Sequence, residues 1–165
     1  MNEHRFSKSK FERGVLLSIN MEEAYRYAAT ADGMTKWFVG KAVYTTPDGR
    51  VREGNELIEK GDKYDWDWVY KDFGVKGEVL EANGKDYVKF TFGSTATFDI
   101  RLSEVEGRVL FMLTQESLPD NPMPEEAHIN CYVCWTLFVM NLKSVAEGGK
   151  DLREWDYDMN GLVNW

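Results

Sequence analysis

The sequence has few of the residues that form disulfide bonds or bind metal ions. Its 165 residues include only two cysteines, two histidines and four prolines. Cys131 and Cys134 lie three residues apart in a stretch with helical spacing, and the two histidines are far from each other. Neither a disulfide framework nor a zinc site follows from this set. We therefore expect no metal, no cofactor, and a reducing, cytoplasmic location.

Positive charge and long apolar runs are also scarce. The chain carries 20 Lys and Arg against 28 Asp and Glu, a net charge of −8, and shows no basic cluster. Binding to nucleic acid depends on clustered cations, so it is not expected. The longest apolar run, Leu137–Met140, is far shorter than a bilayer span, and residues 1–5 are too polar for a signal peptide. We therefore do not expect membrane insertion. We expect a neutral, apolar or basic partner.

Aromatic residues, in contrast, are abundant. Six Trp, eight Tyr and nine Phe make up 14% of the chain, and 43% of all residues are hydrophobic. A chain of this length forms one ordinary domain with a real core. We treat residues 1–165 as one domain with a core at about 12–150, and most of the aromatic bulk must face that core or a cavity.

Turn signals at short intervals predict an antiparallel sheet. They include Pro47-Asp48-Gly49, Asn83-Gly84 and Glu106-Gly107, and apolar residues alternate between them. In residues 64–70, for example, Tyr and Trp share one face and Asp the other. Successive hairpins of this kind form a meander of about six or seven strands.

Two segments have helical rather than strand spacing. Asn20 followed three residues later by Glu23 is typical of a helix start, and a second short helix is expected near residues 34–38. Apolar residues then recur every three or four positions from Cys131 to Val145, between Glu125-Glu126 and Gly148-Gly149. This pattern predicts one long helix over about 125–147. The fold class is therefore α+β, with a curved antiparallel sheet around a C-terminal helix.

At this point the chain resembles the START-like, helix-grip superfamily, also called SRPBCC, and within it the bacterial homologues of the heat-shock-protein-90 ATPase activator. The resemblance covers about residues 12–150. It is carried by segments in a shared order: Ile19–Ala24, Lys36-Trp37-Phe38, Gly54-Asn55, Trp66 and Trp68, Val75–Glu81, Trp135–Lys143, and Glu147–Asp151.

The resemblance implies a hydrophobic cavity between sheet and helix and a range of uses, from binding lipids, sterols or hormones to polyketide cyclisation and assistance of a chaperone. We expect an apolar small molecule or lipid as the partner. The sequence shows no neighbouring co-chaperone domain, so a chaperone partner is a secondary expectation. The expected ligand-binding residues are Trp37, Phe38, Trp66, Trp68, Tyr70, Trp135 and Phe138.

Each of these residues also has a purely structural interpretation. The strand aromatics can fill the core instead of lining a cavity, and Trp37 and Phe38 are favoured as anchors of the short helix over a cavity lip. The Cys pair lies inside a helix, away from the N-terminal position where a redox pair is activated, and is interpreted as buried and structural. His128 is a weak candidate for the cavity mouth.

Evidence for catalysis is slight, and an enzyme is the alternative rather than the expectation. Asp65 and Asp67 share the polar face of their strand and are interpreted as solvated surface charges. A cyclase-like or hydrolase-like enzyme would use Tyr70, Arg101 or Glu116 if they pointed inward. No residue is predicted to be catalytic.

The segment 151–165 extends past the region of resemblance. Its first residues, Lys150–Glu154, have the charge pattern of solvated chain, and large apolar groups follow at Trp155 and Tyr157. We expect Trp155 and Tyr157 to dock on the domain and the chain from Gly161 onward to be mobile, because leaving the two rings in water forgoes part of their burial energy. The alternative is a terminus that is frayed throughout.

Overall fold

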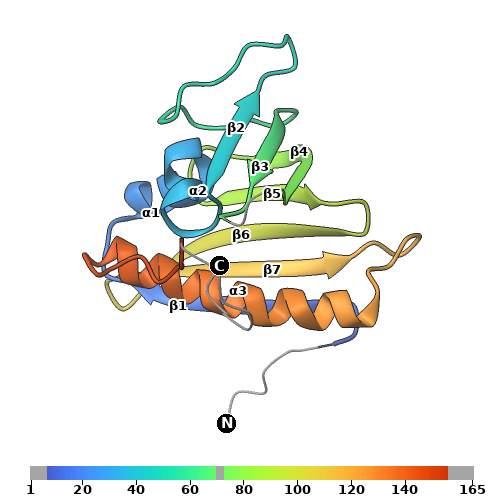
Figure 1. The fold of residues 1–165 in the computed structure, drawn as a ribbon. Helices are drawn as coiled ribbons and strands as arrows, with labels where there is room; N and C mark the ends of the chain where they lie inside the picture. Colours follow the sequence, from blue (N-terminus) through green and yellow to red (C-terminus); the bar gives the residue numbers. More distant parts are fainter. Residues whose placement is uncertain (1–6, 70–72, 156–165) are drawn as a thin grey trace.

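A computed structural model, which describes residues 7–69 and 73–155, confirms the expected architecture. Seven antiparallel strands form one sheet in the order β1-β7-β6-β5-β4-β3-β2. Two short helices follow the first strand, and one long helix ends the described fold (Figure 1). The elements are β1 (Lys10–Leu17), α1 (Met21–Ala29), α2 (Ala31–Trp37), β2 (Lys41–Thr45), β3 (Lys63–Asp67), β4 (Gly74–Ala82), β5 (Tyr87–Phe92), β6 (Ala96–Val105), β7 (Arg108–Ser117) and α3 (Glu125–Ala146).

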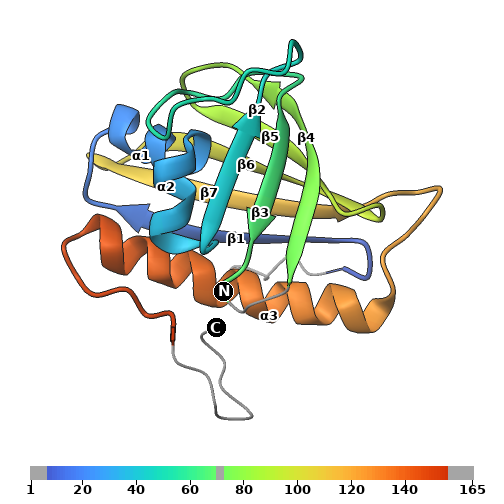
Figure 2. The same cartoon turned by 45° about the horizontal axis from the view of Figure 1, so that its top comes forward.

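The sheet curves strongly, so that β2, β3 and β4 stand across the middle of α3 while β1 and β7 run along it (Figure 2). A register shift in β4, between Val79 and Glu81, provides one local bend. Gly77 provides a close approach, because a Cβ atom there would lie 2.5 Å from the hydroxyl oxygen of Tyr64. The inner face of the sheet thus carries large rings directly against the backbone.

The short helices begin as the sequence indicates. The Asn20 side chain accepts a hydrogen bond from the backbone N–H of Glu23 at the start of α1. Thr30 caps α2 in the same way through Gly33. Both helices bury small residues against the sheet, and α2 ends at Trp37 and Phe38, which enter the core.

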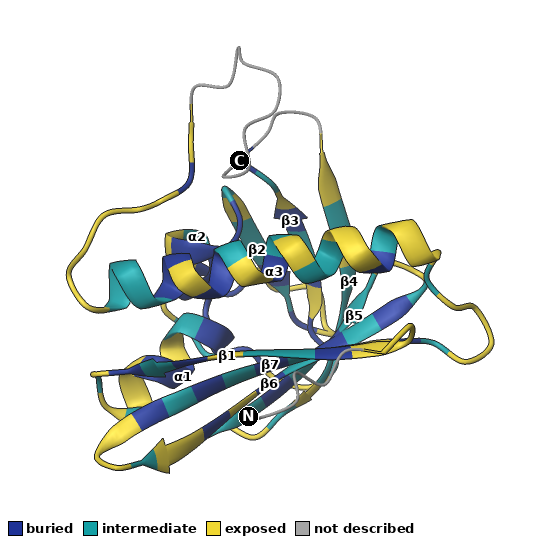
Figure 3. Cartoon of the chain, turned by 90° about the horizontal axis from the view of Figure 1, so that it is seen from below, coloured by how far each residue is buried: buried dark blue, intermediate teal, exposed yellow. Residues whose placement is uncertain are grey.

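Helix α3 begins and ends within one residue of the predicted bounds. It packs along β1 and against α2, and Gly148 follows it with a φ of 80°. Among the described helices, α3 alone is long and apolar enough to cross a membrane. The core helix of a water-exposed domain can have the same length and composition. Here one side of α3 is buried on the sheet, and its outward side is exposed (Figure 3).

The segment after α3 is a strap held by one buried residue. It departs from the expected solvated chain only at Arg153, since Lys150, Asp151, Leu152 and Glu154 are exposed. Arg153 is buried and donates hydrogen bonds to the carbonyl oxygens of Val39 and Thr35 and to the carboxylate of Asp151. Buried Asn141 on α3 donates to the carbonyl of Trp37 and to Asp151. Residues 151–153 therefore fasten the end of α2 to α3.

Trp155, two residues after this strap, does not dock as predicted. Trp155 is 55% exposed, and the Arg153 guanidinium lies 5.2 Å from its ring centroid. Tyr157 and the chain from Gly161 onward lie outside the described residues. The docking prediction is therefore wrong for Trp155.

Candidate functional site: an aromatic core with an accessible rim

The predicted ligand-binding residues separate into a sealed group and an accessible one. Five of them are at most 3% exposed, namely Trp37, Phe38, Trp66, Trp135 and Phe138. Trp68 is only partly buried. Tyr70 lies outside the described residues.

Phe38 lies at the centre of the sealed group. Its ring centroid is 4.5 Å from that of Trp135, 5.0 Å from that of Phe138 and 5.6 Å from that of Trp66. These are ordinary stacked and edge-to-face distances between rings in direct contact. The five sealed residues are therefore packed on one another, and a ligand could reach them only by displacing a ring.

Hydrogen bonds hold two of the sealed indoles in place. Trp37 Nε1 donates to the backbone carbonyl of Tyr27, and Trp135 Nε1 donates to the side-chain oxygen of buried Gln115 at 2.7 Å. The first bond fastens α2 to α1. The second joins α3 to the end of β7.

The indole N–H of Trp66 and the hydroxyl of Tyr44 are polar groups inside this apolar region. Both are buried, and in the part of the chain that the structure describes neither the indole N–H nor the hydroxyl makes a well-formed hydrogen bond. Burial raises the pKa of Tyr44 above its usual range, and the nearby Trp66 N–H only partly opposes this rise. Burial also raises the pKa of Tyr64 to about 12. Both phenols stay protonated at neutral pH.

Three partly exposed rings border the sealed group, and we call Trp68, Phe73 and Phe92 the aromatic rim. The ring centroid of Trp68 lies 5.3 Å from that of Phe73 and 6.4 Å from that of Phe92. Phe73 is 55% exposed. The first two rings flank the β3–β4 connection, and the third ends β5.

The rim is continuous with the sealed group. The ring centroid of Trp68 is 5.4 Å from that of Phe38, and that of Phe92 is 5.8 Å from that of Trp135. Sequence alternation places Phe92 on the same face as Phe90, which indicates its position. Phe73 carries no comparable signal, because it lies beside the turn of a hairpin where alternation ends.

The residues considered for catalysis point elsewhere. Arg101 is exposed, with its guanidinium 4.6 Å from the ring centroid of Tyr87. Glu116 is exposed and lies 4.0 Å from Lys10. Because neither faces the aromatic core, the enzyme alternative loses two of its three candidate residues. Tyr70, the third, lies outside the described residues.

The remaining candidates are placed as follows. Asp65 and Asp67 form exposed ion pairs with Lys76 and Lys41, which confirms them as surface charges. His128 is buried and its Nε2 lies 2.9 Å from the carbonyl oxygen of Ser7, so it does not reach a cavity mouth. Cys131 and Cys134 are partly exposed rather than buried. Burial still raises the pKa of both thiols.

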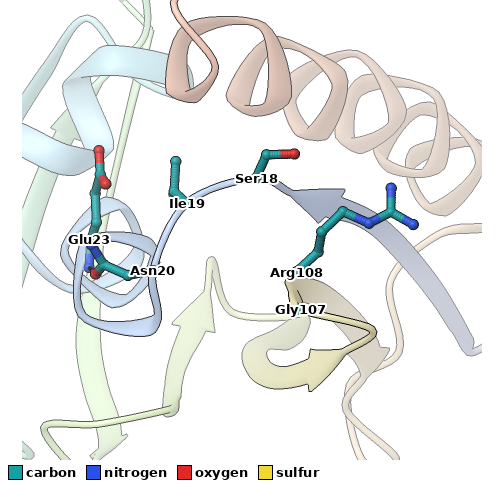
Figure 4. A pocket seen from close by; sticks show the side chains of 6 residues that line it. All are labelled: Ser18, Ile19, Asn20, Glu23, Gly107 and Arg108. Carbon is teal, nitrogen blue, oxygen red and sulfur yellow. Dashed lines mark hydrogen bonds between the residues drawn. The ribbon is translucent and has the colours of Figure 1, made fainter.

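One surface hollow lies far from the aromatic rim. It is formed by Ser18, Ile19, Asn20, Glu23, Gly107 and Arg108 (Figure 4). Gly107 and Arg108 lie at the start of β7, whereas the rim lies near its other end, since Phe92 pairs with Ala96 and Ala96 with Ser117. Asn20 already caps α1 there, and the hollow is wide open.

A curved antiparallel sheet closed by one long helix defines a START-like helix-grip protein. The family model of "Activator of Hsp90 ATPase homolog 1-like protein" matches residues 18–147. The chain belongs to this family. A search of curated proteins finds no match.

Solved structures with the same fold are distant in sequence. Protein SSP2350 from Staphylococcus saprophyticus is 12% identical with a TM-score of 0.68, over 87% of this chain and 96% of that one. The Aha1 dimer from Colwellia psychrerythraea is 18% identical with a TM-score of 0.63, over 86% and 98%. DynU16, a putative protein in the dynemicin biosynthetic locus, is 16% identical with a TM-score of 0.66, over 89% and 50%. These likenesses show the fold alone.

Proposed function

We propose that the protein binds an apolar small molecule or lipid between the curved sheet and α3, with the aromatic rim as its contact surface. The observation that carries this proposal is the partial exposure of Trp68, Phe73 and Phe92 beside a sealed aromatic group. A cluster of exposed rings continuous with a core is a common form of ligand-binding surface.

The chemistry of the rim selects the ligand class. Rings offer flat apolar surface, and covering such a side chain contributes about 1.5–3 kcal/mol when burial is complete. The net charge of −8 disfavours strongly anionic ligands such as nucleic acid. A ligand with a flat ring system or an aliphatic chain fits these properties best.

Other uses within the family have less support in this chain. A cyclase-like or hydrolase-like reaction requires acid or base groups directed at the ligand, and Arg101 and Glu116 lie on the outer side of the sheet. A chaperone-associated role would follow from family membership, but no described surface of this chain specifies such a partner. Ligand binding is therefore the function that the geometry supports best.

The proposal is tested by ligand affinity in matched variants. Native mass spectrometry of the protein with fatty acids, sterols and flat aromatic compounds selects a ligand, and calorimetry measures its affinity. Trp68→Ala and Phe92→Ala should each weaken binding about tenfold or more, since each removes part of an apolar contact surface.

The matched control is Val51→Ala, because Val51 is an exposed apolar residue in the β2–β3 connection, outside the rim. Its affinity should equal that of the wild type. The proposal fails if no compound of the panel binds, or if the Trp68 and Val51 variants bind equally well.

A further inference from the structure

Two thiols and a thioether belong to the region where the β7–α3 connection meets α3. Cys131 and Cys134 lie one helical turn apart on α3, and both are partly exposed. Met123 belongs to the preceding connection, and its thioether sulfur accepts a hydrogen bond from the Cys131 thiol at 3.8 Å. The Cys131 thiol therefore contacts a thioether from a separate segment, and the Cys134 thiol lies one helical turn further along α3.

The position of the thioether is determined by a buried amide. The side-chain nitrogen of Gln115 donates to Met123 Sδ at 3.6 Å, and the side-chain oxygen of Gln115 accepts from Trp135 Nε1. Gln115 is 0% exposed. Met123 also lies between Pro122 and Pro124, which restrict its backbone. The sulfurs of Met123 and Cys131 are thus held by hydrogen bonds that exist without a bound ion.

The ligand set distinguishes between classes of metal ion. Within residues 7–69 and 73–155, no group of three His, Cys, Asp or Glu side chains could hold a metal, which leaves no set for a hard cation or a closed zinc site. Two thiols and a thioether are soft ligands, and soft sulfur ligands select Cu(I).

We propose that Cys131, Cys134 and Met123 bind one Cu(I) ion. Two S–H bonds break and their protons pass to solvent, two copper–thiolate bonds form, and the thioether of Met123 donates an electron pair as the third ligand. The copper and the sulfurs keep their oxidation states, so the step needs no oxidant or reductant. This inference is independent of ligand binding at the aromatic rim.

The test is an anaerobic titration of the reduced full-length protein with Cu(I) in competition with the chelator bicinchoninate. We expect one Cu(I) per chain, with ultraviolet absorption from copper–thiolate bonds, and no comparable uptake of Zn(II). The double variant Cys131→Ser/Cys134→Ser should fail to take Cu(I) from bicinchoninate. Met123→Leu should lower the affinity for Cu(I) about 10-fold or more, the scale on which even a supporting residue changes metal affinity.

Met140→Leu is the matched control, because Met140 is 49% exposed on the outward side of α3 and away from the cysteines. It should bind Cu(I) as the wild type does. X-ray absorption of the wild-type complex adds a readout that does not depend on variant folding and should show three sulfur neighbours. Failure of the wild type to compete, equal binding by the double cysteine variant, equal binding by the Met123 and Met140 variants, or nitrogen and oxygen neighbours would each overturn the proposal.

Discussion

Phe38 shows how single residues carry both the stability and the site of this protein. It follows α2 directly, and its ring lies within 5.6 Å of rings from β3, α3 and the β3–β4 connection. The same residue therefore joins the sealed group to the accessible rim. Buried polar residues such as Arg153 and Gln115 add directional contacts around this apolar centre.

The first prediction at this scale concerns Phe138, which is 3% exposed and packs edge-to-face on Phe38. Phe138→Ala should lower the free energy of unfolding by about 3–5 kcal/mol, because it removes a buried ring and leaves a cavity. Chemical denaturation measures the change. Met140→Ala, an exposed position on the same helix, should stay within about 0.5 kcal/mol. Equal midpoints for the two variants would contradict the burial of Phe138.

The second concerns Arg153. Arg153→Met should lower the free energy of unfolding by about 2–3 kcal/mol, since the carbonyls of Val39 and Thr35 and the Asp151 carboxylate lose their donor. Exposed Arg108 provides the control, and Arg108→Met should change stability little. If thermal or chemical unfolding does not distinguish the variants, Arg153 does not fasten α2.

At the scale of elements, local sequence signals predict the bounds of an element wherever a pattern extends over many residues. The spacing from Cys131 to Val145 predicts α3 within one residue of each end, and Asn20 marks the start of α1. The strap at 151–153 was misinterpreted because its charged residues have no local signal of burial. The two backbone carbonyls that accept from Arg153 lie more than 100 residues earlier in the chain, so only the tertiary structure reveals them.

The hydrogen bonds of the strap also predict that the stability of the fold depends on pH. Burial opposes ionisation of Asp151, but hydrogen bonds from Arg153 outweigh it and lower the pKa of the carboxyl below its usual value. A carboxyl with a lowered folded-state pKa stabilises the fold fully above its unfolded pKa of about 3.9, and this stabilisation is lost as the pH falls through the folded value. The wild type should therefore lose its stability advantage over Asp151→Asn on acidification below about pH 4. Denaturation of both proteins across this range checks it, and a constant difference would contradict it.

At the scale of the whole molecule, the sequence predicted the helix-grip fold and the aromatic residues of its interior, but not which of them remain accessible. Alternation places Trp66 and Trp68 on one face without showing that Trp66 is sealed by Phe38 while Trp68 lies at the edge. That difference depends on where the curved sheet ends relative to α3. Phe73 was missed for the same reason, because its exposure arises from the way β3 and β4 end.

The most direct measurement for ligand binding at the rim is a titration followed by amide and indole NMR signals, since the chain has six tryptophans that serve as separate probes. With the ligand selected from the panel, the indole signal of Trp68 and the amide signals of Phe73 and Phe92 should shift most, and the sealed indoles of Trp37 and Trp66 should shift less. Shifts centred on the hollow at Ser18, Asn20 and Arg108, or on the outward side of α3 at Ile129, Val133 and Met140, would contradict binding at the aromatic rim.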